Sequence, residues 1–239
     1  MNPGQTLLNS IFPNIKSLDN PSSVENDQIE QYIILIMGDS KVGKSSFCSR
    51  FAFNTFNLEI KESQKTESYM KKIEIFNKKI NVVLIDVASN NSNDKNMLQE
   101  LCNYIDGAII MYDITSTKSF HKIEHWVDEL KKLTIQQNEK KIPVFIIGNK
   151  ADLQFLRTVE KETVLEKIVK LYSKLGSQDS NSGIHGYESK EVNGIDENNV
   201  QECMKDMIAQ IFLMNLNEQD KEKYEKMYTE DTENWRGVM

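Results

Sequence analysis

The stretch Gly38-Asp39-Ser40-Lys41-Val42-Gly43-Lys44-Ser45 decides the fold of this chain. It fits the pattern G-x-x-x-x-G-K-[ST], follows the apolar run 32–37 and precedes a segment, 45–51, that can open a helix. A strand, a glycine-rich loop and a helix in this order predict a phosphate-binding loop. Backbone N–H groups and the helix N-terminus would face the phosphates, Lys44 would span the outer phosphates and Ser45 could ligate Mg²⁺. The alternative, a chance glycine-rich turn, requires pattern, strand and helix to agree by accident.

The composition favours one domain with appendages. The 239 residues suffice for one well-buried core, and the formal charge of −7 gives no basic patch for nucleic acid. The three scattered cysteines fit neither a disulfide framework nor a paired metal site, and indicate a reducing compartment. No apolar run approaches the length of a membrane-spanning helix, and residues 1–4 show neither a signal peptide nor a myristoylation site. We expect a soluble protein, cytoplasmic or bound to an intracellular protein assembly.

Buried strands and amphipathic helices alternate along the rest of the chain. Strands are predicted at 68–76, 80–86, 107–113 and 144–148, and the polar stretch 173–186 predicts that the last strand is short or irregular. This alternation predicts an α/β fold, a single phosphate-loop domain with a mostly parallel six-stranded sheet and helices on both faces. Apolar residues repeat at helical spacing in three segments: Phe120, Ile123, Val127, Leu130 and Leu133; Val164, Leu165, Ile168, Val169 and Tyr172; and Val200, Cys203, Met204, Met207, Ile208, Ile211 and Phe212.

Four further segments fall where a nucleotide bound to Lys44 could be reached. They are Asp86-Val87-Ala88-Ser89, Asn149-Lys150-Ala151-Asp152, Glu188-Ser189-Lys190 and Phe56. With the stretch 110–120, which looks like the Rab pattern V-V-Y-D-V-T-x-x-x-S-F, this set resembles the Ras-superfamily small GTPases, and the Rab branch in particular, over roughly residues 31–213.

The resemblance implies a guanine nucleotide, GTP or GDP, with Mg²⁺. Asn149 and Asp152 would read guanine, because the carboxylate accepts from a ring N–H and an amine that adenine lacks. Lys150 and Phe56 would cover the two faces of the base, although Phe56 fits plain core packing equally well, and the backbone N–H of Ser189 would reach the guanine oxygen. The implied nucleotide contacts are Asp39, Ser40, Lys41, Val42, Gly43, Lys44, Ser45, Ser46, Phe56, Ser63, Asp86, Ser89, Asn149, Lys150, Asp152, Leu153, Ser189 and Lys190.

Two departures from the family pattern bear on hydrolysis. Where the family reads D-T-A-G-Q, this chain reads Asp86-Val87-Ala88-Ser89-Asn90, so the metal-side Asp86 is kept while the glycine and the water-orienting glutamine are replaced. Asn90 has the same amide on a shorter stem and is a weak catalytic replacement, so we expect weak or absent intrinsic hydrolysis. Ser63 aligns with the metal-binding threonine, with Thr66 as a rival and a plain surface loop as the alternative. The implied metal ligands are Ser45, Ser63 and Asp86.

The ends of the chain set the domain boundaries. We predict a flexible N-terminal extension at 1–30, the Ras-like domain at 31–214 and a charged tail at 215–239 that can be helical. No cysteine follows Cys203, so we expect no prenyl anchor. Docking on a partner protein stays open for both ends, through Leu7, Leu8, Ile11, Phe12 and Ile15, and through Met214, Leu216, Tyr224, Met227, Tyr228 and Trp235.

Two functions therefore compete. One is a slow Rab-like switch in intracellular trafficking that contacts protein partners through its switch surface and its ends. The other is a catalytically degenerate Rab-like subunit of a stable multiprotein complex, for example a ciliary or organellar one, in which the nucleotide is structural.

Overall fold

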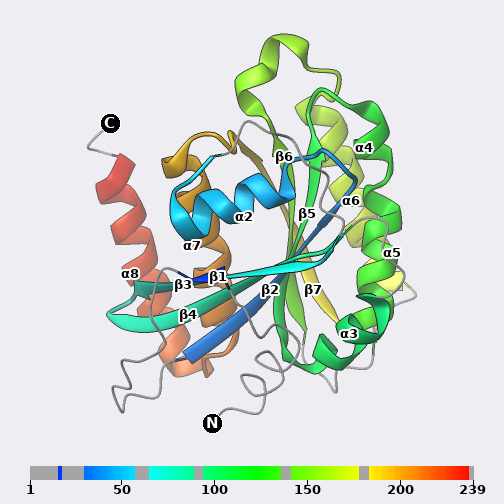
Figure 1. The fold of residues 1–239 in the computed structure, drawn as a ribbon. Coiled ribbons are helices and arrows are strands. Elements are labelled where there is room, and N and C mark those ends of the chain that lie inside the picture. Colours follow the sequence, from blue (N-terminus) through cyan, green and yellow to red (C-terminus); the bar gives the residue numbers. More distant parts are fainter. Residues whose placement is uncertain are drawn as a thin grey trace.

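One mixed sheet organises the protein (Figure 1). The computed structural model describes residues 16–17, 30–56, 65–88, 94–135, 141–177 and 183–236. Within these residues the strand order is β1-β3-β4-β2-β5-β6-β7. The strands are β1 (Lys16–Ser17), β2 (Glu30–Gly38), β3 (Glu67–Ile75), β4 (Lys78–Asp86), β5 (Ile105–Asp113), β6 (Ile142–Asn149) and β7 (Ile184–Val192).

The strand directions confirm the predicted fold class. Strands β4, β2, β5, β6 and β7 are parallel neighbours, and β3 is antiparallel to β4 in a hairpin. These six strands are those that the sequence predicts. The two-residue strand β1 is an addition, because it pairs in parallel with Tyr69 and Met70 of β3 from within the segment predicted as a flexible extension.

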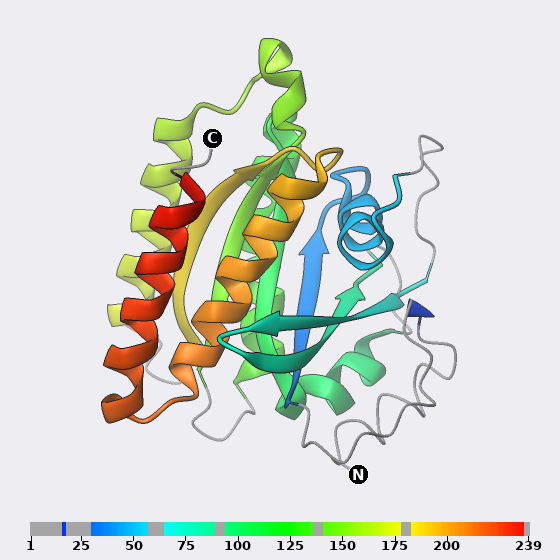
Figure 2. The ribbon, with the colours of Figure 1, turned by 90° about the vertical axis from the view of Figure 1, so that its left-hand side faces the viewer.

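Helices cover both faces of the sheet: in Figure 1 the sheet lies between the two helix layers, and Figure 2 looks onto the face that α7 and α8 cover. Helices α3, α5 and α6 share one apolar core with the sheet, while α2 and α7 share the other, and α8 packs outside α7. The helices are α2 (Lys44–Phe53), α3 (Asp94–Leu101), α4 (Thr117–His121), α5 (Ile123–Thr134), α6 (Lys161–Ser177), α7 (Glu197–Met214) and α8 (Glu218–Arg236), with 3₁₀ turns η1 (Cys102–Tyr104) and η2 (Ala151–Leu156).

The central strands are buried along almost their whole length. All nine residues of β5 and all eight of β6 are buried, as expected for parallel strands covered on both faces. The register aligns the carboxyl ends of these strands: Gly38 pairs with Met111, Asp113 with Asn149, and Asn149 with Val192. Residues far apart in the sequence therefore meet at one edge of the sheet, where ligands of such folds bind.

Two details of the predicted elements are wrong. Strand β7 is not short: it has nine residues and pairs along the length of β6, although a register shift between Ile142 and Pro143 makes the pairing irregular near its start. The single helix predicted around 120–133 is divided at Lys122 into α4 and α5. Both details affect the site, because β7 sets one of its walls and Lys122 reaches the phosphate loop.

The C-terminal tail forms a helix that packs on the domain. The ring of Tyr224 in α8 lies 5.1 Å from that of Phe212 in α7 and 5.4 Å from that of Phe76, at the tip of the β3–β4 hairpin. The hydroxyl of Tyr228 donates to Asp206. Tyr224 and Tyr228, which the sequence left open as contacts for another protein, are thus contacts within the chain. No helix in the described part of the chain is long and apolar enough to cross a membrane.

Candidate nucleotide-binding site

The phosphate loop joins β2 to α2, and its two glycines take conformations that other residues rarely adopt. Gly38 has φ 143° and Gly43 has φ 99°. A Cβ at Gly38 would lie 2.4 Å from the carbonyl oxygen of Met111, and one at Gly43 would lie 2.3 Å from the side-chain nitrogen of Asn149. Helix α2 has no side-chain cap and no acidic residue in its first turn, so its N-terminus is suited to an external anion.

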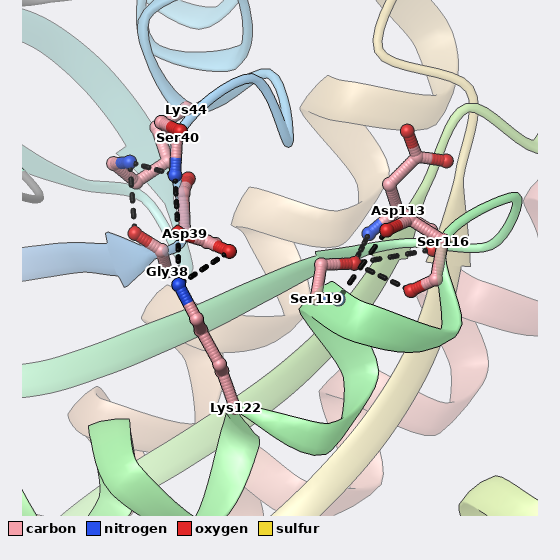
Figure 3. Close-up of polar contacts among 8 residues, drawn as sticks. All are labelled: Gly38, Asp39, Ser40, Lys44, Asp113, Ser116, Ser119 and Lys122. Atoms are coloured by element: carbon pink, nitrogen blue, oxygen red, sulfur yellow. Dashed lines mark hydrogen bonds and ion pairs between the residues drawn. The ribbon is translucent and has the colours of Figure 1, made fainter.

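Lys44 is folded back onto this loop (Figure 3). Its ammonium donates to the carbonyl oxygens of Gly38 at 2.9 Å and Asp39 at 3.0 Å, and its side chain is buried. Burial lowers the pKa of Lys44, and the negative charge of Asp86 opposes that shift. A phosphate chain on the loop would give this buried cation a charged partner, which favours binding of an anion.

Two oxygen ligands suited to a divalent cation lie side by side behind Lys44. The hydroxyl of Ser45, in the first turn of α2, donates to the carboxylate of Asp86, which is fully buried at the end of β4. Hydroxyl and carboxylate oxygens are the hard ligands that Mg²⁺ prefers, so the donor set fits this ion. Nearby, the hydroxyl of Thr66 accepts from the backbone N–H of Ala88 at 3.1 Å. Thr66, the rival to Ser63 in the sequence, is thereby tied to the end of the same strand.

A lysine that the sequence did not reveal also reaches the phosphate loop. Lys122, at the junction of α4 and α5, donates to Asp39 at 2.9 Å, as Figure 3 shows. Burial opposes ionisation of Asp39, but hydrogen bonds from Lys122 and from the N–H of Ser40 outweigh it, so the pKa of Asp39 is lowered. Asp39 therefore anchors the outer side of the loop. A lone lysine inside an amphipathic pattern gave no signal for this role.

Asn149 connects the phosphate end of the site to its base end. Its amide nitrogen donates to the carbonyl oxygen of Val42 at 2.8 Å, and its amide oxygen accepts from the N–H of Gly194 at 3.0 Å. The side chain is only 3% exposed. Asn149 thus joins the loops after β2, β6 and β7, and the geometry of the site depends on it.

The other predicted base-reading residues lie around this bridge. Lys150 has φ 67° and pairs with the carboxylate of Asp113 at 2.6 Å, which holds it at the end of β5. Asp152 is exposed in η2, and Leu153 is half-buried and donates its N–H to the carbonyl of Lys150. Phe56 is half-buried, with the guanidinium carbon of Arg50 5.5 Å from its ring centroid. Its predicted place on the base stays a prediction.

The other residues predicted to contact the phosphates differ in exposure. Ser40 and Ser46 are half-buried, Val42 is buried, and Lys41 is exposed with φ 65°. Ser63, Ser89 and Asn90 lie outside the described residues. Their predicted roles in holding the metal and in hydrolysis stay predictions.

Ser189 and Lys190 do not reach the edge of the site. They pair with Ile146 and Ile147 inside the sheet, and Lys190 forms an ion pair with Asp206 of α7. Because β7 runs to Val192, the backbone N–H at the edge belongs instead to Gly194. The Ser-Lys pair in the sequence was therefore misleading. A strand β7 long enough to pair with all of β6 ends at Val192, and this length would have indicated Gly194 instead.

The end of β7 is fixed by a paired arginine. Arg157, which follows η2, donates two hydrogen bonds to the carboxylate of Glu191, at 2.7 and 2.8 Å. Burial raises the pKa of Glu191, but Arg157 and Lys161 together outweigh burial, so the net shift is downward. This bidentate pair ties the turn after β6, where base reading is predicted, to the last residues of β7.

Fold and site together define a phosphate-loop nucleotide-binding protein of the α/β class. A model of the Ras family matches residues 33–181, and the chain belongs to that family. It is 34% identical over 138 residues to the Ras-related protein Rab11B of Nicotiana tabacum, covering 58% of this chain and 61% of that protein. It is 30% identical over 178 residues to the GTP-binding protein ypt3 of Schizosaccharomyces pombe, 74% of each chain. With Ras-related protein Rab-11A of Dictyostelium discoideum it shares 28% identity over 181 residues, 76% of each.

Proposed function

We propose that the protein binds GTP and GDP with Mg²⁺ and acts as a slow Rab-like switch in intracellular trafficking. The observation that carries the proposal is the bridge made by Asn149, from the Val42 carbonyl to the Gly194 N–H. A nucleotide whose phosphates lie on the loop at Lys44 would then have its base beside the turn that contains Asp152. The similarity to Rab-related proteins supports the same assignment.

Each part of the site has a distinct task in this proposal. The N–H groups of the phosphate loop and Lys44 would bind the phosphates, and Asp152 would select guanine. Ser45, Asp86 and Ser63 would hold Mg²⁺, which supplies positive charge beside the outer phosphates. In this proposal, residues of this chain would both bind and select the nucleotide.

Hydrolysis is proposed to be slow because Asn90 stands where the family has glutamine. The amide of asparagine sits one methylene closer to the backbone, and positioning of the attacking water is most of what the protein contributes to this reaction. Ser89 adds a Cβ where the family has glycine, which restricts the backbone.

The test combines nucleotide identification with single-turnover hydrolysis. We expect protein purified without added nucleotide to release GDP or GTP, and bound GTP to be hydrolysed slowly. Asn90→Gln should raise the rate several-fold, and Asn91→Gln is the matched control, which should not. Purified protein that neither contains nor takes up guanine nucleotide would overturn the proposal.

A second candidate, a nucleotide-bound structural subunit of a stable complex, is favoured by the same Ser89-Asn90 replacement. In that case bound GTP would persist unhydrolysed in both wild type and Asn90→Gln. The same partner proteins would also co-purify with it whether GDP or GTP is bound. A partner that binds one nucleotide state and leaves the other favours the switch.

A further inference from the structure

Helix α8 rests on the domain without burying any of its own described side chains. Of residues 218–229, the part of α8 whose side chains the structure describes, none is buried, whereas eight of the 18 residues of α7 are. Four residues of α8 are half-buried and lie on one face by helical spacing: Lys221, Tyr224, Met227 and Tyr228. A helix held by one half-buried face is among the least stable units of a fold, which open locally while the core stays closed.

The α8 docking surface, on which this face rests, is made of four residues: Phe76 at the tip of the β3–β4 hairpin, Lys190 of β7, and Asp206 and Phe212 of α7. The ring of Tyr224 contacts those of Phe76 and Phe212. The hydroxyl of Tyr228 donates to Asp206, which also pairs with Lys190. In Figure 1, α8 lies outside α7, beside the tip of the hairpin.

Packing beneath α8 is incomplete. A cavity of about 350 Å³ lies between α7, β7 and Tyr228, and Glu188 and Gln210 are among the residues that line it. In the described part of the chain, the amide oxygen of Gln210 is buried without a hydrogen-bond partner. Protein interiors are normally filled and their buried polar atoms paired. A segment that filled this cavity and donated to Gln210 would therefore fit the surface better than α8 does.

Helix α8 itself indicates what kind of segment the surface accepts. Tyr224 and Tyr228 stand at i and i+4 on its inner face, and most of its other residues are charged. Only residues 215–217 join α8 to the end of α7. A helix on so short a connection has an effective concentration on the order of millimolar, so only a better-fitting helix displaces it.

We propose that the α8 docking surface is a binding site for a partner's amphipathic helix with aromatic residues at i and i+4, and that α8 occupies it in cis as a removable cover. The partner helix would insert its aromatic rings at Phe76 and Phe212, in the manner of a helix in an apolar groove. The nucleotide site is separate, because the other end of the β3–β4 hairpin, where Glu67 pairs with Asp86, leads to it.

Hydrogen exchange of the full chain tests whether α8 is removable. We expect the amides of α8 to exchange about tenfold faster, or more, than those of α7. Tyr224→Ala should raise the rate in α8 by about another tenfold, because the contact with Phe76 and Phe212 is lost, and should leave α7 protected. Glu225→Ala, at an exposed neighbour on the same helix, is the matched control and should change neither rate. An α8 as protected as α7, or one that Tyr224→Ala leaves unchanged, overturns the proposal.

A fluorescent peptide of residues 215–236 tests the docking surface. The full-length variant Tyr224→Ala/Tyr228→Ala has lost both rings from its own α8, so it should bind the peptide about tenfold tighter, or more, than wild type does by anisotropy. A peptide with both tyrosines changed to alanine is the control and should not bind. Adding Phe76→Ala to the protein should abolish binding, which places the peptide on the docking surface.

Three results would overturn this assignment: no binding to the double variant, equal binding to wild type, or binding that Phe76→Ala leaves intact. Continued protection of α7 in every variant excludes misfolding. Failure to bind guanine nucleotide would leave both measurements unaffected, so the two proposals fail separately.

Discussion

The phosphate end and the base end of the candidate site are held in different ways. At the phosphate end, the groups expected to meet the ligand, Lys44 and Ser45, bond within the protein to loop carbonyls and to Asp86. At the base end the tasks are divided: Asn149 is buried and bridges two loops, while Asp152 is exposed. A substitution at the phosphate end should therefore remove nucleotide binding. At the base end, a substitution of Asn149 should lower stability, whereas one of Asp152 should change base selection alone.

The largest effect is expected for Lys44→Ala. The variant loses the only buried cation of the described phosphate loop, so affinity for GDP should fall by about 100-fold or more. The fold should persist, because the carbonyls of Gly38 and Asp39 that the ammonium contacts belong to the same loop as Lys44. Titration with a fluorescent GDP analogue measures the affinity and circular dichroism the fold. Lys205→Ala on α7 is the control, and equal affinity in the two variants would contradict the assignment.

Asn149→Ala should affect both ends at once. It removes the donor to Val42 and the acceptor for Gly194, and leaves two buried backbone groups without partners. We expect a loss of about 1–3 kcal/mol in the free energy of unfolding of the nucleotide-free protein, with at least tenfold weaker GDP binding. Urea denaturation measures the first and fluorescence titration the second. Unchanged stability would show that the bridge is dispensable.

Asp152→Asn should change base choice and leave stability alone. The exposed carboxylate is expected to accept from guanine, and an amide can pair instead with xanthine, which offers an acceptor where guanine has its amine. GDP affinity should fall by about 100-fold while affinity for xanthosine diphosphate rises. Competition between the two nucleotides measures the preference, and thermal unfolding without nucleotide should match wild type. Asp196→Asn is a control outside the base turn, and a preference unchanged in Asp152→Asn would contradict guanine reading.

The contrast also explains what the sequence could predict. The phosphate loop could be predicted because its residues are continuous in the sequence and the positions of its glycines have a geometric cause. The turn proposed to read guanine could be located because Asn149 and Asp152 follow a buried strand at a fixed spacing. Gly194 could not be predicted, because its place depends on where β7 ends, and that depends on pairing with β6 rather than on local residues. Lys122 was hidden for a similar reason: its partner Asp39 lies 83 residues away.

Helix α6 shows a further limit of pattern reading, because Leu165 and Val169 on it are 57% and 68% exposed. Val164, Leu165, Ile168 and Val169 form one apolar set by spacing, yet the helix is wide enough that only its inner row contacts the sheet. Periodicity gave the helix correctly but could not say which side of a broad apolar face stays in solvent.

The smallest effect is expected for Lys122→Ala, which tests whether the outer anchor of the phosphate loop matters for binding. The pair with Asp39 is partly exposed, so its contribution to stability should be at most about 1 kcal/mol. Because the folded protein lowers the pKa of Asp39, that contribution is present above the ordinary aspartate pKa and is lost as pH falls through the folded value. Wild type and Lys122→Ala should thus differ slightly in urea stability at neutral pH and converge in acid.

GDP affinity should change by no more than about threefold, since Lys44 still holds the inner side of the loop. A loss as large as that of Lys44→Ala would place Lys122 among the phosphate-binding groups.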